Sequence, residues 1–223
     1  MVSRAALAIV LVAVSLAASA ATAFEQPKCA LCPICENGSP SFWFRMRHCV
    51  AGTSSPFGDK QFTAAAAQCL EGQLSQVFGQ SHVTKEVFDA VVYKMMYPRQ
   101  PLVMHFAGDN GVGKTMVARM ISRALSTRCG DAECNTGSAL HTISGTAFDG
   151  VQLSDARKVM IGGIVEHARK HPHGVVLLDD LTAMDPALVK AMTPLMGRSP
   201  AFPEAPEVNL GHLLVIMTTD FGK

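Results

Sequence analysis

The chain has 223 residues and a formal net charge of +1, with hydrophobic residues at 48% and charged residues at 17%. This length allows one domain with a sizeable core and short flanking segments, and it does not favour a second full domain. The near-neutral charge gives no broad basic surface, so we expect no nucleic-acid partner.

The first 23 residues are expected to be a secretory signal peptide. Arg4 precedes an apolar run over 5–18, and Ala21-Thr22-Ala23 gives the small-x-small pattern that signal peptidase cleaves. The alternative is an uncleaved signal anchor, although the run is short for a membrane span and rich in Ala. The leader predicts a mature protein in a lumen or outside the cell.

Residues 24–60 form a Cys-rich appendage that shows no sustained helical or strand periodicity. Disulfides are the expected state of these cysteines in a secretory lumen. Zinc binding is the alternative, because several cysteines are separated by two intervening residues. The spacing leaves the connectivity open, except that Cys129 and Cys134 enclose a loop short enough for a local bridge. The seven cysteines, an odd number that leaves at least one without an intramolecular partner, are Cys29, Cys32, Cys35, Cys49, Cys69, Cys129 and Cys134.

The remaining chain, 61–223, alternates helical and strand patterns. The spacing of apolar residues predicts a helix from Phe62 that Gly79 ends, and a second over 81–96. Strict alternation of strands and helices after that point implies a parallel sheet covered on both faces, an α/β three-layer αβα sandwich. The predicted strands are 102–107, 139–144, 174–178 and 212–218, and the predicted helices are 114–125, 152–170 and 186–196.

A glycine-rich pattern, Gly108-x4-Gly113-Lys114-Thr115, stands between a predicted strand and a predicted helix. This is the sequence and the context of a P-loop, in which backbone N–H groups, a lysine and a hydroxyl bind phosphates and Mg²⁺. The alternative is an accidental glycine turn. The pattern predicts ATP and Mg²⁺ as cofactors, with Thr115 as a metal ligand. The expected nucleotide-binding residues here are Gly108, Asp109, Asn110, Gly111, Val112, Gly113, Lys114, Thr115 and Met116.

Polar side chains follow two of the later predicted strands. Asp179, at the carboxyl edge of a parallel sheet beside the P-loop, is expected to hold Mg²⁺ through water. Asp180 is the predicted catalytic carboxylate that orients or deprotonates the attacking water, and a simple turn cap is the alternative. Thr219 and Asp220 end the last strand and are both candidates to contact that water, with an ordinary polar strand exit as the alternative.

Successive segments of the chain resemble the boxes of the Clp and torsin branch of AAA+ ATPases: "LSQVFGQSHVTKEVFDAV", the P-loop segment, "GVVLLDD" and "LLVIMTTDFGK". The leader and the cysteines favour torsin. The resemblance implies that Phe78 and Gly79 lie beside the adenine. It also implies a homo- or hetero-oligomer of AAA+ subunits that remodels polypeptide clients like a chaperone, with a transmembrane activator, in the lumen of the endoplasmic reticulum or nuclear envelope.

The sequence departs from this family at several positions. Torsins carry Asn where this chain has Thr115, the family has Glu at the position of Asp180, and a sensor Asn is expected at Asp220. The helical lid subdomain is expected to be absent, so we expect ATP hydrolysis that is weak or activator-dependent. Two alternatives stay open: an ATP-binding, hydrolysis-deficient module that recruits a membrane activator, and a small-molecule kinase.

Overall fold

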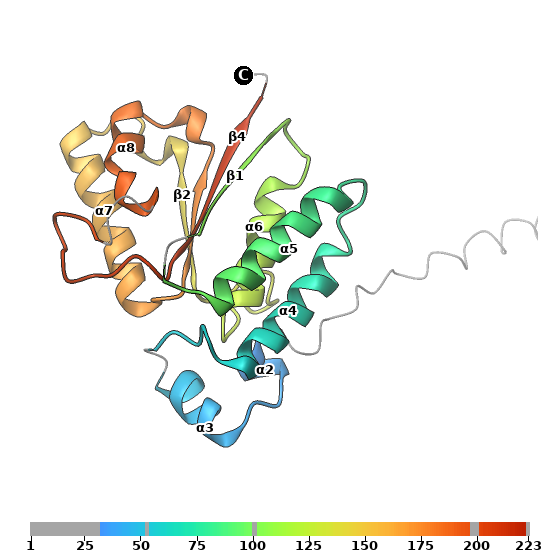
Figure 1. The fold of residues 1–223 in the computed structure, drawn as a ribbon. Helices are drawn as coiled ribbons and strands as arrows, with labels where there is room; N and C mark the ends of the chain where they lie inside the picture. Colours follow the sequence, from blue (N-terminus) through green and yellow to red (C-terminus); the bar gives the residue numbers. More distant parts are fainter. Residues whose placement is uncertain (1–31, 52–53, 100–101, 197–200, 222–223) are drawn as a thin grey trace, which may run out of the picture.

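A computed structural model of the chain describes residues 32–51, 54–99, 102–196 and 201–221. The predicted signal peptide and Cys29 lie outside these residues. A parallel sheet with the strand order β1-β4-β3-β2 forms the middle layer (Figure 1). The predicted parallel sheet is therefore confirmed. Its strands are β1 (Leu102–Gly108), β2 (Leu140–Ser144), β3 (Val175–Asp179) and β4 (Leu214–Asp220).

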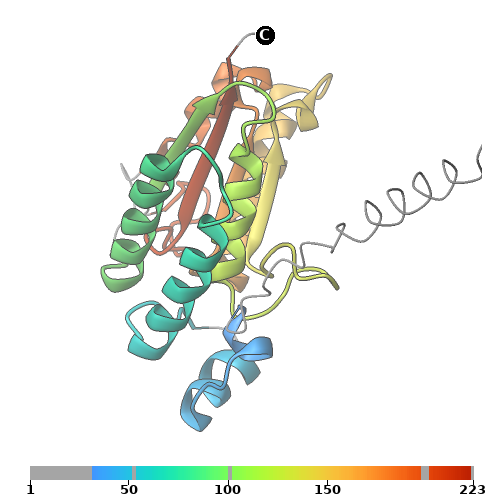
Figure 2. The same cartoon turned by 90° about the vertical axis from the view of Figure 1, so that its right-hand side faces the viewer.

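Helices cover both faces of this sheet, as the alternating pattern predicted (Figures 1 and 2). Successive side chains of a strand point to opposite faces. Val175 and Leu177 of β3 accordingly pack with the helices of one face, and Val176 and Leu178 pack with those of the other. The first face carries α4 (Lys60–Leu74), α5 (Ser81–Met96) and α6 (Lys114–Leu125), and the second carries α7 (Leu153–Lys170) and α8 (Pro186–Ala191).

Two of these helices end earlier than the sequence pattern predicted. α4 ends at Leu74, and residues 75–80 form a loop in which Gly79 has a φ of 77°. α8 ends at Ala191, and the chain continues as the 3₁₀ helix η4 (Thr193–Met196). Leu195 of η4 is fully buried, like Leu188 of α8. The spacing of apolar residues therefore could not show that α8 ends and a separate 3₁₀ helix follows.

The Cys-rich segment contains short helices that its sequence did not predict: α2 (Ile34–Asn37), α3 (Phe42–Phe44) and the π-helix η1 (Arg45–Val50). Helices of this length show no periodicity in a sequence window, and isolated ones are not stable in water. Disulfides and burial hold them here.

The structure pairs six of the seven cysteines as disulfides: Cys32–Cys69, Cys35–Cys49 and Cys129–Cys134. The first of these joins the Cys-rich segment to α4, and the second closes a loop within the segment. Ile34 and Phe44 are buried in the same core cluster as α4. The segment therefore packs directly on the sheet-covering helices.

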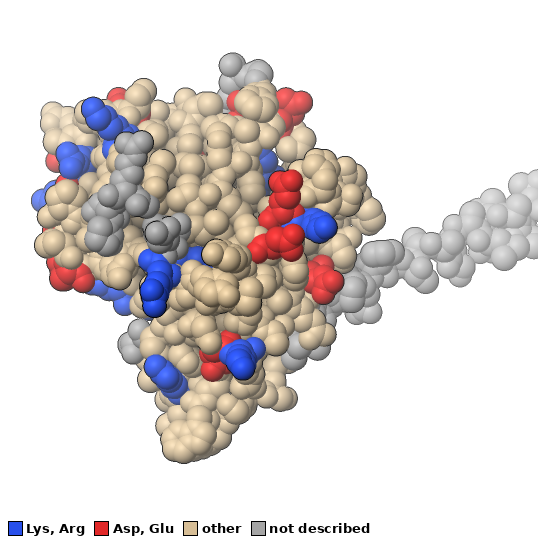
Figure 3. Space-filling model, in the orientation of Figure 1, with Lys and Arg blue, Asp and Glu red and all other residues tan. Residues whose placement is uncertain are grey.

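Charged side chains on the face shown in Figure 3 lie in small, separate groups. Three exposed ion pairs occur among the described residues: Arg157–Glu204, Arg169–Glu207 and Lys170–Glu166. Exposed pairs of this kind contribute about 0–1 kcal/mol each, so burial in the two core clusters dominates the stability.

Within the described ranges, no helix combines the length and the apolar character that crossing a membrane requires.

Candidate nucleotide-binding site

The predicted P-loop connects the end of β1 to the start of α6, at the edge of the sheet where β4 also ends (Figure 1). Gly111 and Gly113 have φ values of 80° and 97°, a left-handed conformation that residues with a side chain rarely adopt. Gly113 is also the N-cap of α6. These glycines turn the loop so that the positive end of the 12-residue helix α6 faces the edge of the sheet.

A pocket of about 410 Å³ lies between the P-loop and the ends of β3 and β4. Its volume falls in the range of about 300–1,000 Å³ that is typical of small-molecule sites. Most of the residues that the sequence predicted for phosphate and metal binding line it. The lining consists of Asn110, Gly111, Gly113, Lys114, Thr115, Met116, Asp179, Asp180, Thr218 and Asp220.

Hard oxygen donors meet on one side of this pocket. The Thr115 hydroxyl donates to Asp179 Oδ1 at 3.0 Å, and the Thr218 hydroxyl donates to the same oxygen at 2.7 Å. Mg²⁺ prefers hydroxyl, carboxylate and water oxygens of this kind. The donor set therefore fits the magnesium site that the sequence predicted at Thr115 and Asp179.

Asp180 lies at the same edge in an unusual backbone conformation. It adopts a left-handed conformation with φ 60° and ψ 67°, and its side chain accepts a hydrogen bond from Thr182 Oγ1. Its backbone N–H donates to Thr218 Oγ1 at 2.9 Å. A Cβ at Gly145 would lie 2.0 Å from the carbonyl oxygen of Asp180, so this backbone is closely packed. Asp180 thus lines the pocket, but Thr182 holds its carboxylate.

Lys114 extends across the pocket and makes polar contacts at its tip. Its Nζ donates to the carbonyl oxygens of Gly108 at 2.9 Å and of Asp109 at 2.8 Å. The same nitrogen lies 2.7 Å from Asp220 Oδ1. The Asn110 amide, oriented with its nitrogen toward Asp220, donates to Oδ2 at 2.5 Å. The sequence did not predict the ion pair between Lys114 and Asp220.

The polar end of β4 divides between two environments. Thr218 and Asp220 line the pocket, whereas Thr219 does not; its hydroxyl lies 3.0 Å from His105 Nε2 on the neighbouring strand. The structure therefore does not place Thr219 where the sequence analysis expected a contact with the attacking water, and Thr218 was overlooked. The alternation of side chains along a strand puts Thr218 and Asp220 on the same face and could have separated them from Thr219.

The loop between α4 and α5 approaches the P-loop through Gln80, whose side-chain amide donates to the Val112 carbonyl at 3.1 Å. Phe78 is 86% exposed in this loop, and Gly79 follows it. The loop thus contacts the P-loop. The adenine contact of Phe78 and Gly79 stays a prediction.

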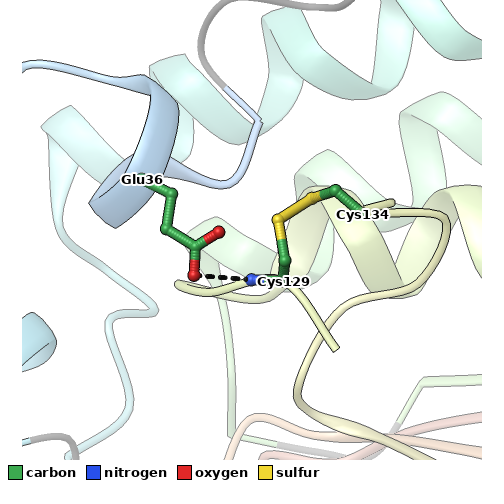
Figure 4. A group of neighbouring side chains, drawn as sticks. All are labelled: Glu36, Cys129 and Cys134. Carbon is green, nitrogen blue, oxygen red and sulfur yellow. Dashed lines mark hydrogen bonds between the residues drawn. A yellow bond between two sulfur atoms is a disulfide. The ribbon is translucent and has the colours of Figure 1, made fainter. Parts of the chain in front are cut away.

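A second group of potential metal ligands lies outside the lining of this pocket. The ligand atoms of Glu36, Cys129 and Cys134 lie within 4.8 Å of one another. Figure 4 shows that the two sulfurs are bonded to each other and that Glu36 accepts a hydrogen bond from the Cys129 backbone nitrogen at 3.1 Å. Disulfide sulfurs are not thiolates and do not bind zinc. This group instead connects α2 to the loop after α6.

Comparison with protein families adds a match over residues 99–223 to the model described as AAA domain (Cdc48 subfamily). The matched region is more than half of the 223-residue chain and contains the P-loop, Asp179 and β4. The chain belongs to this AAA family. A comparison with curated proteins found no match.

Solved structures of Hsp104 have a fold similar to that of this AAA chain. In the closed state of Hsp104 with ATPγS and FITC-casein, the TM-score is 0.60 at 18% identity, over 79% of this chain. The extended conformation of the S. cerevisiae Hsp104:casein complex has a TM-score of 0.58 at 18% identity, also over 79% of this chain. The AAA chain covers 31% of each of these Hsp104 chains, less than a third of their length. These similarities show a shared fold.

Proposed function

We propose that the chain binds ATP with Mg²⁺ and hydrolyses it to drive the remodelling of protein complexes. The observation that carries this proposal is the convergence of Lys114, Thr115 and Asp179 on one pocket at the N-terminus of α6. These groups match the amine, hydroxyl and carboxylate that P-loop ATPases use on a triphosphate. Membership of the AAA family supports the same assignment.

Each residue has a role that follows from its chemistry. The backbone N–H groups of the loop and the N-terminus of α6 bind phosphate oxygens, and Lys114 places its charge on the outer phosphates. Thr115 and Asp179 hold Mg²⁺, which neutralises part of the phosphate charge when bound. Asp180 orients the attacking water. Because Thr182 holds its carboxylate and an aspartate is one methylene shorter than a glutamate, we expect slow turnover.

The remodelling part of the proposal is supported by the family and by the shared fold with Hsp104, whose solved complexes contain casein. A polypeptide client and an oligomer of AAA+ subunits follow by analogy. We propose further that the chain is torsin-like and acts in the lumen of the endoplasmic reticulum or nuclear envelope with a transmembrane activator. The apolar leader and the disulfides support a secretory location.

Steady-state ATP turnover with and without Mg²⁺ tests the enzymatic part. We expect Mg²⁺-dependent turnover that Lys114→Ala abolishes, because the outer phosphates lose their counter-charge. Lys190→Ala, which removes an exposed lysine of α8, is the matched control and should leave turnover unchanged. Equal turnover in the wild type and Lys114→Ala would refute ATP hydrolysis at this site.

A second candidate function is an ATP-binding module that does not hydrolyse ATP and recruits a partner. The left-handed backbone of Asp180 and its hydrogen bond to Thr182 favour this reading. The discriminating variant is Asp180→Glu, whose longer side chain reaches further into the pocket. The binding module predicts that the wild type turns over ATP no faster than Lys114→Ala. It also predicts that turnover rises in Asp180→Glu. A wild-type rate clearly above that of Lys114→Ala would exclude it.

A further inference from the structure

We propose that Asp220 competes with the nucleotide for Lys114 and makes the pocket discriminate against triphosphates relative to diphosphates. This inference rests on the proposed function, because it concerns the same pocket. It assigns to Asp220 a role in nucleotide preference that differs from a contact with the attacking water.

The position of Asp220 is fixed by the sheet. In the parallel register of β1 and β4, Asp220 is the partner of Gly108, the first residue of the P-loop. The next residue, Phe221, donates its backbone N–H to the Gly108 carbonyl at 3.1 Å. Asp220 is therefore held against the P-loop by backbone hydrogen bonds, and its carboxylate needs no loop movement to reach Lys114.

The ion pair between Lys114 and Asp220 is well shielded from solvent. The two atoms lie 2.7 Å apart, and the side chains are only 10% and 16% exposed. A charge pair of low exposure interacts more strongly than an exposed pair, because water screens it less. The Asp220 carboxylate thus binds the Lys114 ammonium, the positive charge that a P-loop offers to the outer phosphates.

All three ammonium donors of Lys114 already have partners. A lysine ammonium has three donors, and here they face Gly108 O at 2.9 Å, Asp109 O at 2.8 Å and Asp220. A phosphate that binds Lys114 therefore has to displace a carbonyl or the Asp220 carboxylate. Displacing the carboxylate is the electrostatic exchange of one anion for another.

The displaced carboxylate then stays beside the nucleotide, since the backbone of β4 holds it there. A γ-phosphate adds negative charge next to Asp220, whereas a diphosphate does not bring that group. Like charges at short distance repel, so the triphosphate loses more affinity than the diphosphate. A neutral Asn at this position would remove the repulsion and could donate a hydrogen bond to a phosphate oxygen.

The test compares the binding of ADP and of the non-hydrolysable triphosphate AMP-PNP to the full chain by calorimetry, with and without Mg²⁺. The variants are Asp220→Asn and Asp220→Ala, each checked for folding by circular dichroism. Asp89→Asn removes the same charge from an exposed site on α5 and is the matched control. We expect the ratio of the AMP-PNP Kd to the ADP Kd to fall at least about tenfold in both Asp220 variants and to stay unchanged in the control.

Three other results would overturn the inference. An unchanged Kd ratio in proteins that bind both nucleotides would remove the role of Asp220 and leave the proposed function intact. A ratio that rises in Asp220→Asn only with Mg²⁺ would show that Asp220 is a metal ligand instead. Failure of the wild type and all variants to bind either nucleotide would refute the proposed function, and the inference with it.

Discussion

The ring of His173 lies in the core next to the start of β3, and it gives the fold a defined dependence on pH. The side chain is only 3% exposed, and neither ring nitrogen has a hydrogen-bond partner within the described residues. The rings of Phe57 and Phe62 lie 5.7 and 6.5 Å from it, centroid to centroid. Burial is the main cause, and nearby histidines a smaller one, of a pKa for His173 that is lowered from 6.5 to about 3.

The sign of the effect follows from this lowered pKa. Above pH 6.5 the ring is neutral in both the folded and the unfolded chain, and the full stability is present. As the pH falls below 6.5, the unfolded chain binds a proton that the folded chain does not, and stability is lost. One pKa unit corresponds to about 1.4 kcal/mol, so the fall from pH 6.5 to pH 5 removes about 2 kcal/mol through this residue.

Substitution of His173 by Leu, an apolar residue of similar size, tests this reasoning. The free energy of unfolding is measured with urea by circular dichroism at pH 7.5 and at pH 5. The drop between these two pH values should be about 2 kcal/mol smaller in His173→Leu than in the wild type. Part of the fall should remain, since burial also lowers the pKa of His167 to about 4. His82→Leu, at an exposed position of α5, should behave like the wild type. An equal fall in His173→Leu and the wild type would refute the reasoning.

Two further predictions concern the Cys-rich segment and the metal site. Cys35→Ser opens the disulfide to Cys49, 14 residues away, and should lower the free energy of unfolding by about 3 kcal/mol in urea titrations; no change would mean that the bridge does not form. Thr218→Val removes a hydroxyl that donates to Asp179 and should raise the Mg²⁺ concentration needed for half-maximal ATP binding about fivefold. An unchanged midpoint would exclude Thr218 from the metal site.

Local patterns were enough to predict most of the sheet and its covering helices. Each strand and the helices α5, α6 and α7 agree with their sequence predictions within two residues, because apolar periodicity records burial directly. The P-loop was readable because its glycines serve a local backbone requirement. These features depend on residues that are neighbours in the sequence.

The features that the sequence did not reveal depend on contacts between distant segments. The pairing of Cys32 with Cys69 depends on how the Cys-rich segment packs on α4. The ion pair between Lys114 and Asp220 depends on the register of β1 and β4. The left-handed Asp180 packs closely against Gly145, a contact that no spacing in the sequence indicates.

The most direct test of the proposed function is calorimetric titration of the full chain with ATP, with and without Mg²⁺, beside Lys114→Ala and Asp180→Asn. Binding should be saturable in the wild type and tighter with Mg²⁺, it should be lost in Lys114→Ala, and it should persist in Asp180→Asn, which affects turnover only. Both variants need circular dichroism spectra that match the wild type. Wild-type and Lys114→Ala proteins that bind ATP equally, or that both fail to bind it, would contradict a nucleotide site at this P-loop.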